Sequence, residues 1–176
     1  MTVEVNHLSI LFYPDPRLRQ TARPVDPLDP QVRTAAARMI QLMHEAKGVG
    51  LAAPQVGLPW RLFITNPTGE PGNDVFFVNP VLSDPAPEQE AASEGCLSIP
   101  GITVEVRRHK RITVSALDLA GSHFQMTSEE LPARIWQHET DHLDGRLIID
   151  RMSPLDRVAN RKQLKELEGR FAASSV

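Results

Sequence analysis

Gln137-His138-Glu139-Thr140-Asp141-His142 is the stretch around which the rest of the chain is organised. On a helix, residues four positions apart lie one above the other, so His138 and His142 can point at the same metal ion. Glu139 lies beside them, where its carboxylate can reach a water molecule bound to that ion. Two imidazoles and an adjacent carboxylate are typical of divalent-metal hydrolases. The alternative is a pair of surface histidines that are four residues apart by chance.

The composition limits the class of protein. The chain has 176 residues, 41% hydrophobic and 23% charged, which is typical of one globular domain that spans residues 1–176. The formal net charge of -3 argues against a general nucleic-acid binder, and we expect no sequence-specific binding of nucleic acid. No apolar run approaches the roughly 20 residues that span a bilayer, and residues 1–10 do not resemble a secretory signal. We therefore expect a cytoplasmic protein without membrane association, and a monomer.

Hydrophobic periodicity predicts an α+β fold in which antiparallel β-sheets pack around a central helix. Apolar residues at helical spacing predict an N-terminal helix from about Pro30 to Lys47, ended by Gly48. The central helix is predicted to run from about 129–132 to Asp144. Residues 83–90 are expected to be irregular or an edge because they include two prolines. The predicted strands are Arg61–Thr65, Val75–Leu82, Ile102–Arg107, Arg111–Asp118 and His123–Thr127.

The C-terminal tail, residues 154–176, is predicted to be helical, because Ser153 and Pro154 form a helix-start pattern. Residues 151–170 hold six basic and three acidic groups, in a chain whose net charge is negative. A solvated helix face is the simpler interpretation of such a run. The functional interpretation is a surface that docks on the ribosome.

The central motif occurs in several classes of metal hydrolase, which differ in their third ligand. One protease class extends the motif with a glycine and a third histidine. Gly145 stands at the glycine position, but Ile148 stands where the third histidine would be and cannot bind a metal. Two glutamates follow the motif, Glu166 and Glu168, and both are poor candidates for the third ligand because they lie in the charged tail. The lone cysteine, Cys96, is either a small core residue or a thiolate ligand that leaves a fourth position open for water.

The segment Gly48–Gly57 is rich in glycine, and Gln55 is its only polar side chain. It lacks the lysine and the serine or threonine of a phosphate-binding loop. Its glycines let the backbone approach another segment or a ligand closely. By composition alone, this segment is a tight loop with a solvated glutamine.

Three segments together resemble the signature motifs of peptide deformylases. They are Gly48–Gln55 (GVGLAAPQ), Glu94–Ser98 (EGCLS) and Gln137–His142 (QHETDH), in the order and with the spacing of that family. The flanks at 13–19 and 144–153 are also similar, so the resemblance spans nearly the whole chain. It implies an enzyme that hydrolyses the N-formyl group from the formyl-methionine of newly made polypeptides and releases formate.

The resemblance also implies a role for each matching residue. The implied metal ligands are Cys96, His138 and His142. A water bound to that metal would attack the formyl carbon, with Glu139 taking its proton and passing one to the departing amine. The side-chain amide of Gln55 and the backbone N–H of Leu97 would stabilise the oxyanion. The residues implied to contact the substrate are Val49, Gly50, Leu131, Arg134 and Ile135.

Two histidines and a cysteine accept zinc, iron, nickel or cobalt. The resemblance suggests one ferrous ion in the cell, with Zn2+, Ni2+ or Co2+ in purified protein. The implied partners are N-formyl-methionyl peptides and nascent chains and, through the basic tail, the ribosome. Two other functions stay open: a metallopeptidase that cuts ordinary peptide bonds, and a non-catalytic relative that binds nascent chains or ribosomes. The intact metal ligands and Glu139 favour the deformylase.

Overall fold

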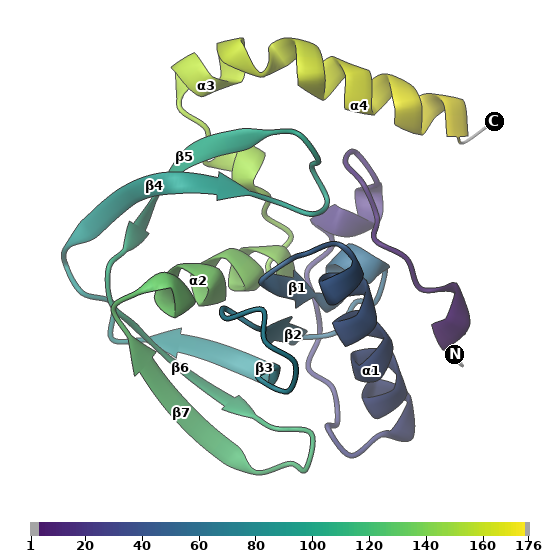
Figure 1. The fold of residues 1–176 in the computed structure, drawn as a ribbon, viewed down its shortest axis with the longest axis vertical. Coiled ribbons are helices and arrows are strands. Elements are labelled where there is room, and N and C mark those ends of the chain that lie inside the picture. The colour runs from purple at the N-terminus through teal and green to yellow at the C-terminus, as the bar shows by residue number, and fades with distance from the viewer. Residues whose placement is uncertain (1–3, 175–176) are drawn as a thin grey trace.

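Helix α2 (Leu131–Leu143) lies at the centre of the molecule, between two antiparallel sheets (Figure 1). The structure is a computed structural model that describes residues 4–174. A five-stranded sheet lies on one side of α2 and a two-stranded sheet on the other. The predicted α+β fold, with antiparallel sheets packed around a central helix, is therefore confirmed.

The five-stranded sheet contains most of the strands that alternation predicts. Its order is β1-β2-β3-β6-β7, and every neighbouring pair is antiparallel. β6 and β7 form a hairpin, as the turn at 119–122 between two alternating segments predicts. β1 lies at one edge of the sheet, which leaves one side of its backbone without a partner strand. The strands are β1 (Gly50–Ala52), β2 (Leu62–Thr65), β3 (Val75–Ser83), β6 (Ile112–Leu117) and β7 (His123–Ser128).

The two-stranded sheet consists of β4 (Gln89–Gly95) and β5 (Thr103–His109), which pair along their whole length. The expectation that residues 83–90 are irregular or an edge is correct in part: β3 includes Ser83 and β4 begins at Gln89, so the irregular part is shorter, and β4 is an edge strand of its two-stranded sheet. The sequence does not predict β4, since this strand holds no β-branched or aromatic residue. Pairing with β5 stabilises an extended conformation that the intrinsic strand propensity of these residues does not favour.

Helix α2 has the ends that its sequence predicts. Pro132 lies in the first turn, and Asp144 caps the C-terminus. Gly145 follows with φ of 72°, and a side chain at this position would collide with the carbonyl oxygen of Arg19. The predicted apolar anchors are each at most 5% exposed, and they are Ile135, Trp136 and Leu143. Because these anchors bury α2 between the sheets, the polar residues on its other faces are also held inside the protein.

Helix α1 (Pro30–Glu45) begins with Asp29, whose side chain accepts the backbone N–H of Gln31. The predicted end of this helix is wrong in detail. The residue with left-handed backbone conformation is Lys47, with φ of 54°, and not Gly48. Position 48 needs a glycine for a different reason, because a Cβ there would lie only 2.7 Å from Cδ1 of Leu97. The two motifs that contain these residues are therefore in direct contact.

The C-terminal tail forms two helices, α3 (Pro154–Ala159) and α4 (Arg161–Ser174), and not one continuous helix. Asn160 separates them, and its side chain donates to the carbonyl oxygen of Asp156. Residues 175–176 of the predicted tail lie outside the described residues. α4 packs against the protein through Leu167, which is 8% exposed.

Short 3-10 helices connect the larger elements within residues 4–174, and they are Val5–His7, Pro16–Arg19, Ala53–Val56 and Ile148–Asp150. In the same part of the chain, no helix combines the length and the apolar character needed to cross a bilayer.

Candidate metal centre

Cys96, His138 and His142 converge at one point between β4 and α2. Each offers a ligand atom, and these atoms all lie within 4.8 Å of one another. Sγ of Cys96 is 3.3 Å from Nε2 of His142, and the two imidazole rings are 5.0 Å apart. Cys96 directly follows β4, whereas the histidines occupy successive turns of α2. The fold therefore brings together three residues that the sequence places in two distant segments.

This donor set fits a divalent metal ion. Metal–sulfur and metal–nitrogen bonds of about 2.3 and 2.1 Å at a tetrahedral angle put the two donor atoms about 3.5 Å apart. The distance of 3.3 Å between Cys96 and His142 agrees with that geometry. Burial, together with the positive charges of His138 and Arg108, lowers the pKa of His142 well below its usual value. His142 is therefore neutral and has a lone pair available for a metal.

Glu94 orients His138, the other histidine of the candidate site. Its Oε2 lies 3.0 Å from Nδ1 of His138, which leaves Nε2 of that ring for the metal. Although burial opposes the charged form, hydrogen bonds to Cys96 and Glu94 and the charge of Glu139 raise the pKa of His138 to about 10. A cation at the ligand atoms would displace that proton, because an imidazole binds metal only in its neutral form.

Arg108 keeps Glu94 ionised. The Arg108 side chain is 3% exposed and donates Nε and Nη2 to Glu94 at 3.0 and 2.9 Å. Although burial raises the pKa of Glu94, the hydrogen bonds from Arg108 and His138 hold it well below its usual range. The sequence alone indicates no role in the metal site for Arg108 or Glu94. No local pattern identifies this pair, because the two residues meet only when β4 and β5 pair.

Glu139 is a buried carboxyl group beside the metal ligands. It is 3% exposed, and its Oε2 has no hydrogen-bond partner among the described residues. Burial raises the pKa of Glu139 to about 7, against the lowering effects of His138 and Arg108. A divalent cation nearby would lower that pKa through its own charge, so at neutral pH the group would be a carboxylate that can accept a proton.

Gly50 leaves the space that Glu139 occupies. A Cβ at position 50 would overlap Oε1 of Glu139 and lie 2.9 Å from its Cδ and 3.0 Å from Cγ2 of Ile135. We expect Gly50→Ala to destabilise the protein by about 1–3 kcal/mol, the usual cost of overpacking. Denaturant unfolding measures this. Gly95→Ala, in strand β4, is the matched control, because a Cβ at that position would meet only the carbonyl oxygen of Ile102, at an ordinary contact distance of 3.9 Å. Equal stability of the two variants would contradict the close contact.

Gln55 faces the cysteine ligand and not solvent, so the interpretation as a solvated loop residue is wrong. It is 1% exposed, and its Oε1 accepts the backbone N–H of Ala52 at 2.8 Å. Its Nε2 is therefore directed to the other side, 3.1 Å from Oγ of Ser98 and 3.6 Å from Sγ of Cys96. Leu97 follows the cysteine, and its backbone N–H meets no acceptor among the described residues. Both donors thus lie next to the candidate metal site.

A cavity of about 430 Å³ opens over Cys96, His138 and Glu139. Its rim is apolar, with Val49 41% and Leu131 51% exposed. The guanidinium group of Arg134 is occupied by Glu94 and by two backbone carbonyl oxygens of β4 and β5. All five residues implied to contact a substrate line this cavity, and they are Val49, Gly50, Leu131, Arg134 and Ile135.

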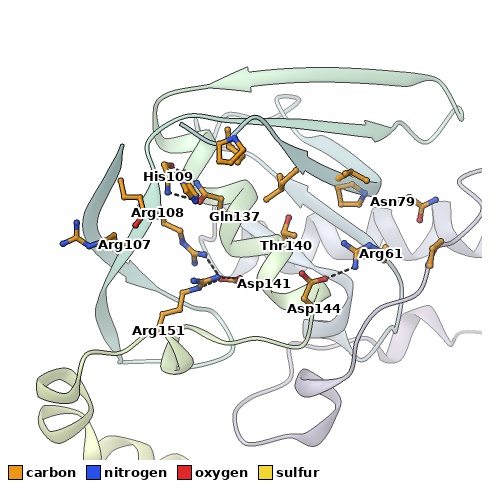
Figure 2. Close-up of a pocket in the computed structure, with 17 residues that line it drawn as sticks. Arg61, Asn79, Arg107, Arg108, His109, Gln137, Thr140, Asp141, Asp144 and Arg151 are labelled. Carbon is orange, nitrogen blue, oxygen red and sulfur yellow. Dashed lines mark hydrogen bonds and ion pairs between the residues drawn. The ribbon is translucent and has the colours of Figure 1, made fainter. Parts of the chain in front are cut away.

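A second, larger cavity of about 840 Å³ lies along another face of α2 (Figure 2). Gln137, Thr140, Asp141 and Asp144 form that face, and none of the candidate site residues lines the cavity. Two carboxylates of this cavity are paired with arginines: Asp144 with Arg61 at 2.9 Å, and Asp141 with Arg108 and Arg151. The groups that can do hydrolytic chemistry therefore lie in the smaller cavity.

Comparison with known proteins gives consistent results. The family model of polypeptide deformylase matches residues 7–158. The peptide deformylase of Thermotoga maritima is 44% identical over 158 residues, which are 90% of this chain and 94% of that protein. The chloroplastic/mitochondrial peptide deformylase 1B of Arabidopsis thaliana is 40% identical over 166 residues, or 93% of this chain, which spans only 61% of that relative.

Solved structures of the same group are similar in fold. The crystal structure of a plant peptide deformylase has a TM-score of 0.91 and 39% identity, with 96% of this chain and 92% of that chain covered. The structure of the Plasmodium falciparum peptide deformylase has a TM-score of 0.92 and 34% identity, with 96% and 99% covered.

Proposed function

Because this chain belongs to the polypeptide deformylase family, we propose that the residues of its metal centre carry out the reaction of that family. The protein is a metal-dependent deformylase that removes the N-formyl group from formylated nascent chains. One observation supports the assignment of residues most strongly. Cys96, His138 and His142 meet within 4.8 Å of one another beside the buried carboxyl group of Glu139.

The proposed metal ligands are Cys96, His138 and His142. When bound there, a divalent ion supplies Lewis acidity, which lowers the pKa of a water molecule and polarises the formyl oxygen. Glu139 would take a proton from the attacking water molecule as the water oxygen bonds to the formyl carbon. It would then deliver that proton to the amine nitrogen as the carbon–nitrogen bond breaks, which releases formate and a free amino terminus. Its Oε2 has no hydrogen-bond partner among the described residues, which leaves that oxygen available for proton transfer and supports this role.

We propose that Gln55 and Leu97 stabilise the negative charge that develops on the formyl oxygen. The amide nitrogen of Gln55 is already directed towards the site, since Ala52 holds the opposite end of the same amide. The backbone N–H of Leu97 supplies the second donor. Preorganised donors of this kind contribute about 3–4 kcal/mol each to the stability of the transition state.

The substrate peptide is proposed to add as a strand to the open edge of β1, beside Gly50. The methionine side chain would then occupy the apolar part of the cavity, against Val49, Leu131 and Ile135. Arg134 supports the wall of this pocket through its bonds to β4 and β5.

The proposed reaction is tested with a formyl-Met-Ala peptide and its unformylated Met-Ala counterpart. We expect formate and one new amino terminus in equal amounts from the first peptide, and no reaction with the second. Cleavage of the Met-Ala bond without formate would instead identify a metallopeptidase. No turnover of either peptide by metal-loaded protein would favour a non-catalytic relative.

We further propose that the ion is ferrous in the cell, and that Zn2+, Ni2+ or Co2+ replaces it in purified protein. The support is chemical, since a thiolate with two imidazoles accepts each of these ions. Elemental analysis of anaerobically purified protein, paired with activity, tests the proposal. Zinc as the sole ion in fully active anaerobic protein would contradict it.

The tail is proposed to dock on the ribosome. Arg161, Lys162, Lys165 and Arg170 have no ion pair among the described residues of α4, so their charges are available to phosphate groups. We expect the double variant Lys162→Glu, Lys165→Glu to lose co-sedimentation with ribosomes at low salt and to keep its activity on free peptides. Arg33→Glu, on the exposed side of α1, is the charge control. Unchanged co-sedimentation of the double variant would refute the docking proposal.

The remaining proposals concern the protein as a whole. We propose that residues 1–176 form one catalytic domain with a helical tail at 154–176, and that the protein is a cytoplasmic monomer. The family match over residues 7–158 supports a single catalytic unit. Sedimentation equilibrium and cell fractionation test the last two properties, and a dimer or an organellar protein would contradict them.

A further inference from the structure

A chain of charged side chains runs from the partly exposed Arg151, in the segment before the tail, to the buried groups at the candidate metal centre. Arg151 donates Nε and Nη2 to the two oxygens of Asp141, at 2.7 and 2.5 Å. Arg108 donates Nη1 to the same carboxylate at 2.5 Å, and Figure 2 shows the three side chains joined beside α2. The other nitrogens of Arg108 bind Glu94, which lies 3.0 Å from Nδ1 of His138. Each link is a charged hydrogen bond, which is stronger than a neutral one.

Arg108 divides its donors between two carboxylates, and both of them are largely inaccessible to water. The Glu94 side chain is 5% exposed and that of Asp141 is 11% exposed. Oδ1 of Asp141 accepts from Arg151, and no other donor to it is found among the described residues. Without Arg151, this oxygen would be a buried acceptor without a donor, which is unfavourable. Asp141 would then draw Arg108 towards itself and away from Glu94.

This movement of Arg108 would affect His138, the proposed metal ligand that Glu94 orients. Glu94 orients the His138 ring and fixes its tautomer, and Glu94 is itself held by Arg108, with Arg134 as a further donor to its Oε1. Groups that orient metal ligands in this way typically contribute about 10- to 100-fold to metal affinity. We propose that Arg151 is a positioning residue for His138, which acts through Asp141, Arg108 and Glu94. This inference rests on the proposed function only in taking Cys96, His138 and His142 as the metal ligands.

A role in stability alone would have a different signature. The Arg151 side chain is 34% exposed, and its pair with Asp141 faces the second cavity. Loss of Arg151 leaves Oδ1 of Asp141 without a donor, so a lower melting temperature is expected under either role. Faster metal release that depends on the presence of Glu94 is the signature that separates positioning from general support of the fold.

The test compares Arg151→Gln with Arg157→Gln. Arg157 lies nearby in sequence and donates to the carbonyl oxygen of Ile149, but it does not contact Asp141. Zinc release from the loaded full-length protein to a chelator is followed together with the melting temperature of the metal-free protein. We expect release to be about tenfold faster for Arg151→Gln and unchanged for Arg157→Gln. Arg151→Lys should be intermediate, because lysine cannot bind a carboxylate through two parallel hydrogen bonds.

A double-mutant cycle completes the test. If Arg151 acts through Glu94, then Arg151→Gln should have no further effect on zinc release in a Glu94→Gln background. Wild-type zinc release from Arg151→Gln would overturn the inference, as would equal acceleration in both arginine variants. Failure of the wild-type protein to bind zinc would instead overturn the assignment of the metal ligands, so the two failures are distinguishable.

Discussion

Glu139→Gln is expected to lower kcat for deformylation by about 10²- to 10⁴-fold, the usual contribution of a general acid–base group. Glutamine is nearly isosteric with glutamate, but it can neither take a proton from water nor deliver one to the amine. The side chain is buried and lies against Gly50, so the replacement should keep its position. The three metal ligands are unchanged, and the metal content should equal that of the wild-type protein. Steady-state kinetics and elemental analysis of the same sample measure both properties.

Glu105→Gln is the control for this variant. Glu105 is exposed on β5, so its replacement makes the same change in charge away from the cavity. It should retain wild-type kcat. A metal-loaded Glu139→Gln enzyme with wild-type kcat would show that another group moves the proton. A variant that loses its metal would show that Glu139 supports metal binding, which would contradict its proposed role in proton transfer alone.

Cys96→Ser should lose both metal and activity. The thiolate is the only anionic ligand of the three, and a serine hydroxyl does not ionise under the same conditions. We expect metal affinity to fall by more than about 100-fold, beyond the loss typical of groups that only orient a ligand. Metal content after dialysis against a chelator and formate release from formyl-Met-Ala are the two measurements.

The lone cysteine provides an independent test of the same site. Because the chain has one cysteine, a thiol-alkylating reagent can modify only Cys96. Bound metal should protect it, and removal of the metal should expose it to the reagent. Equal alkylation rates with and without metal would contradict Cys96 as a ligand, as would a Cys96→Ser variant that keeps a full complement of metal.

The predictions from sequence succeeded where structure depends on near neighbours in the chain. The helical repeat places His138 above His142 whatever surrounds them, so their meeting was predictable. Strand alternation and the turn between β6 and β7 are local in the same sense, and the hairpin is present as predicted. Failures occurred where distant contacts outweigh local preference. β4 lacks the residues typical of strands, and pairing with β5 determines its conformation.

The candidate site divides in the same way. The sequence by itself determined the metal chemistry: two histidines one helical turn apart, an adjacent glutamate, one cysteine, and three motifs that resemble a known family. Only the tertiary structure decided how that chemistry is supported. The packing buries Gln55 and directs its amide nitrogen at Cys96, and the missing side chain of Gly50 leaves room for Glu139. Arg151 became connected to His138 through three intermediate side chains. The reason is physical: helix geometry follows from successive residues, whereas the burial and pairing of charges depend on which distant segments pack together.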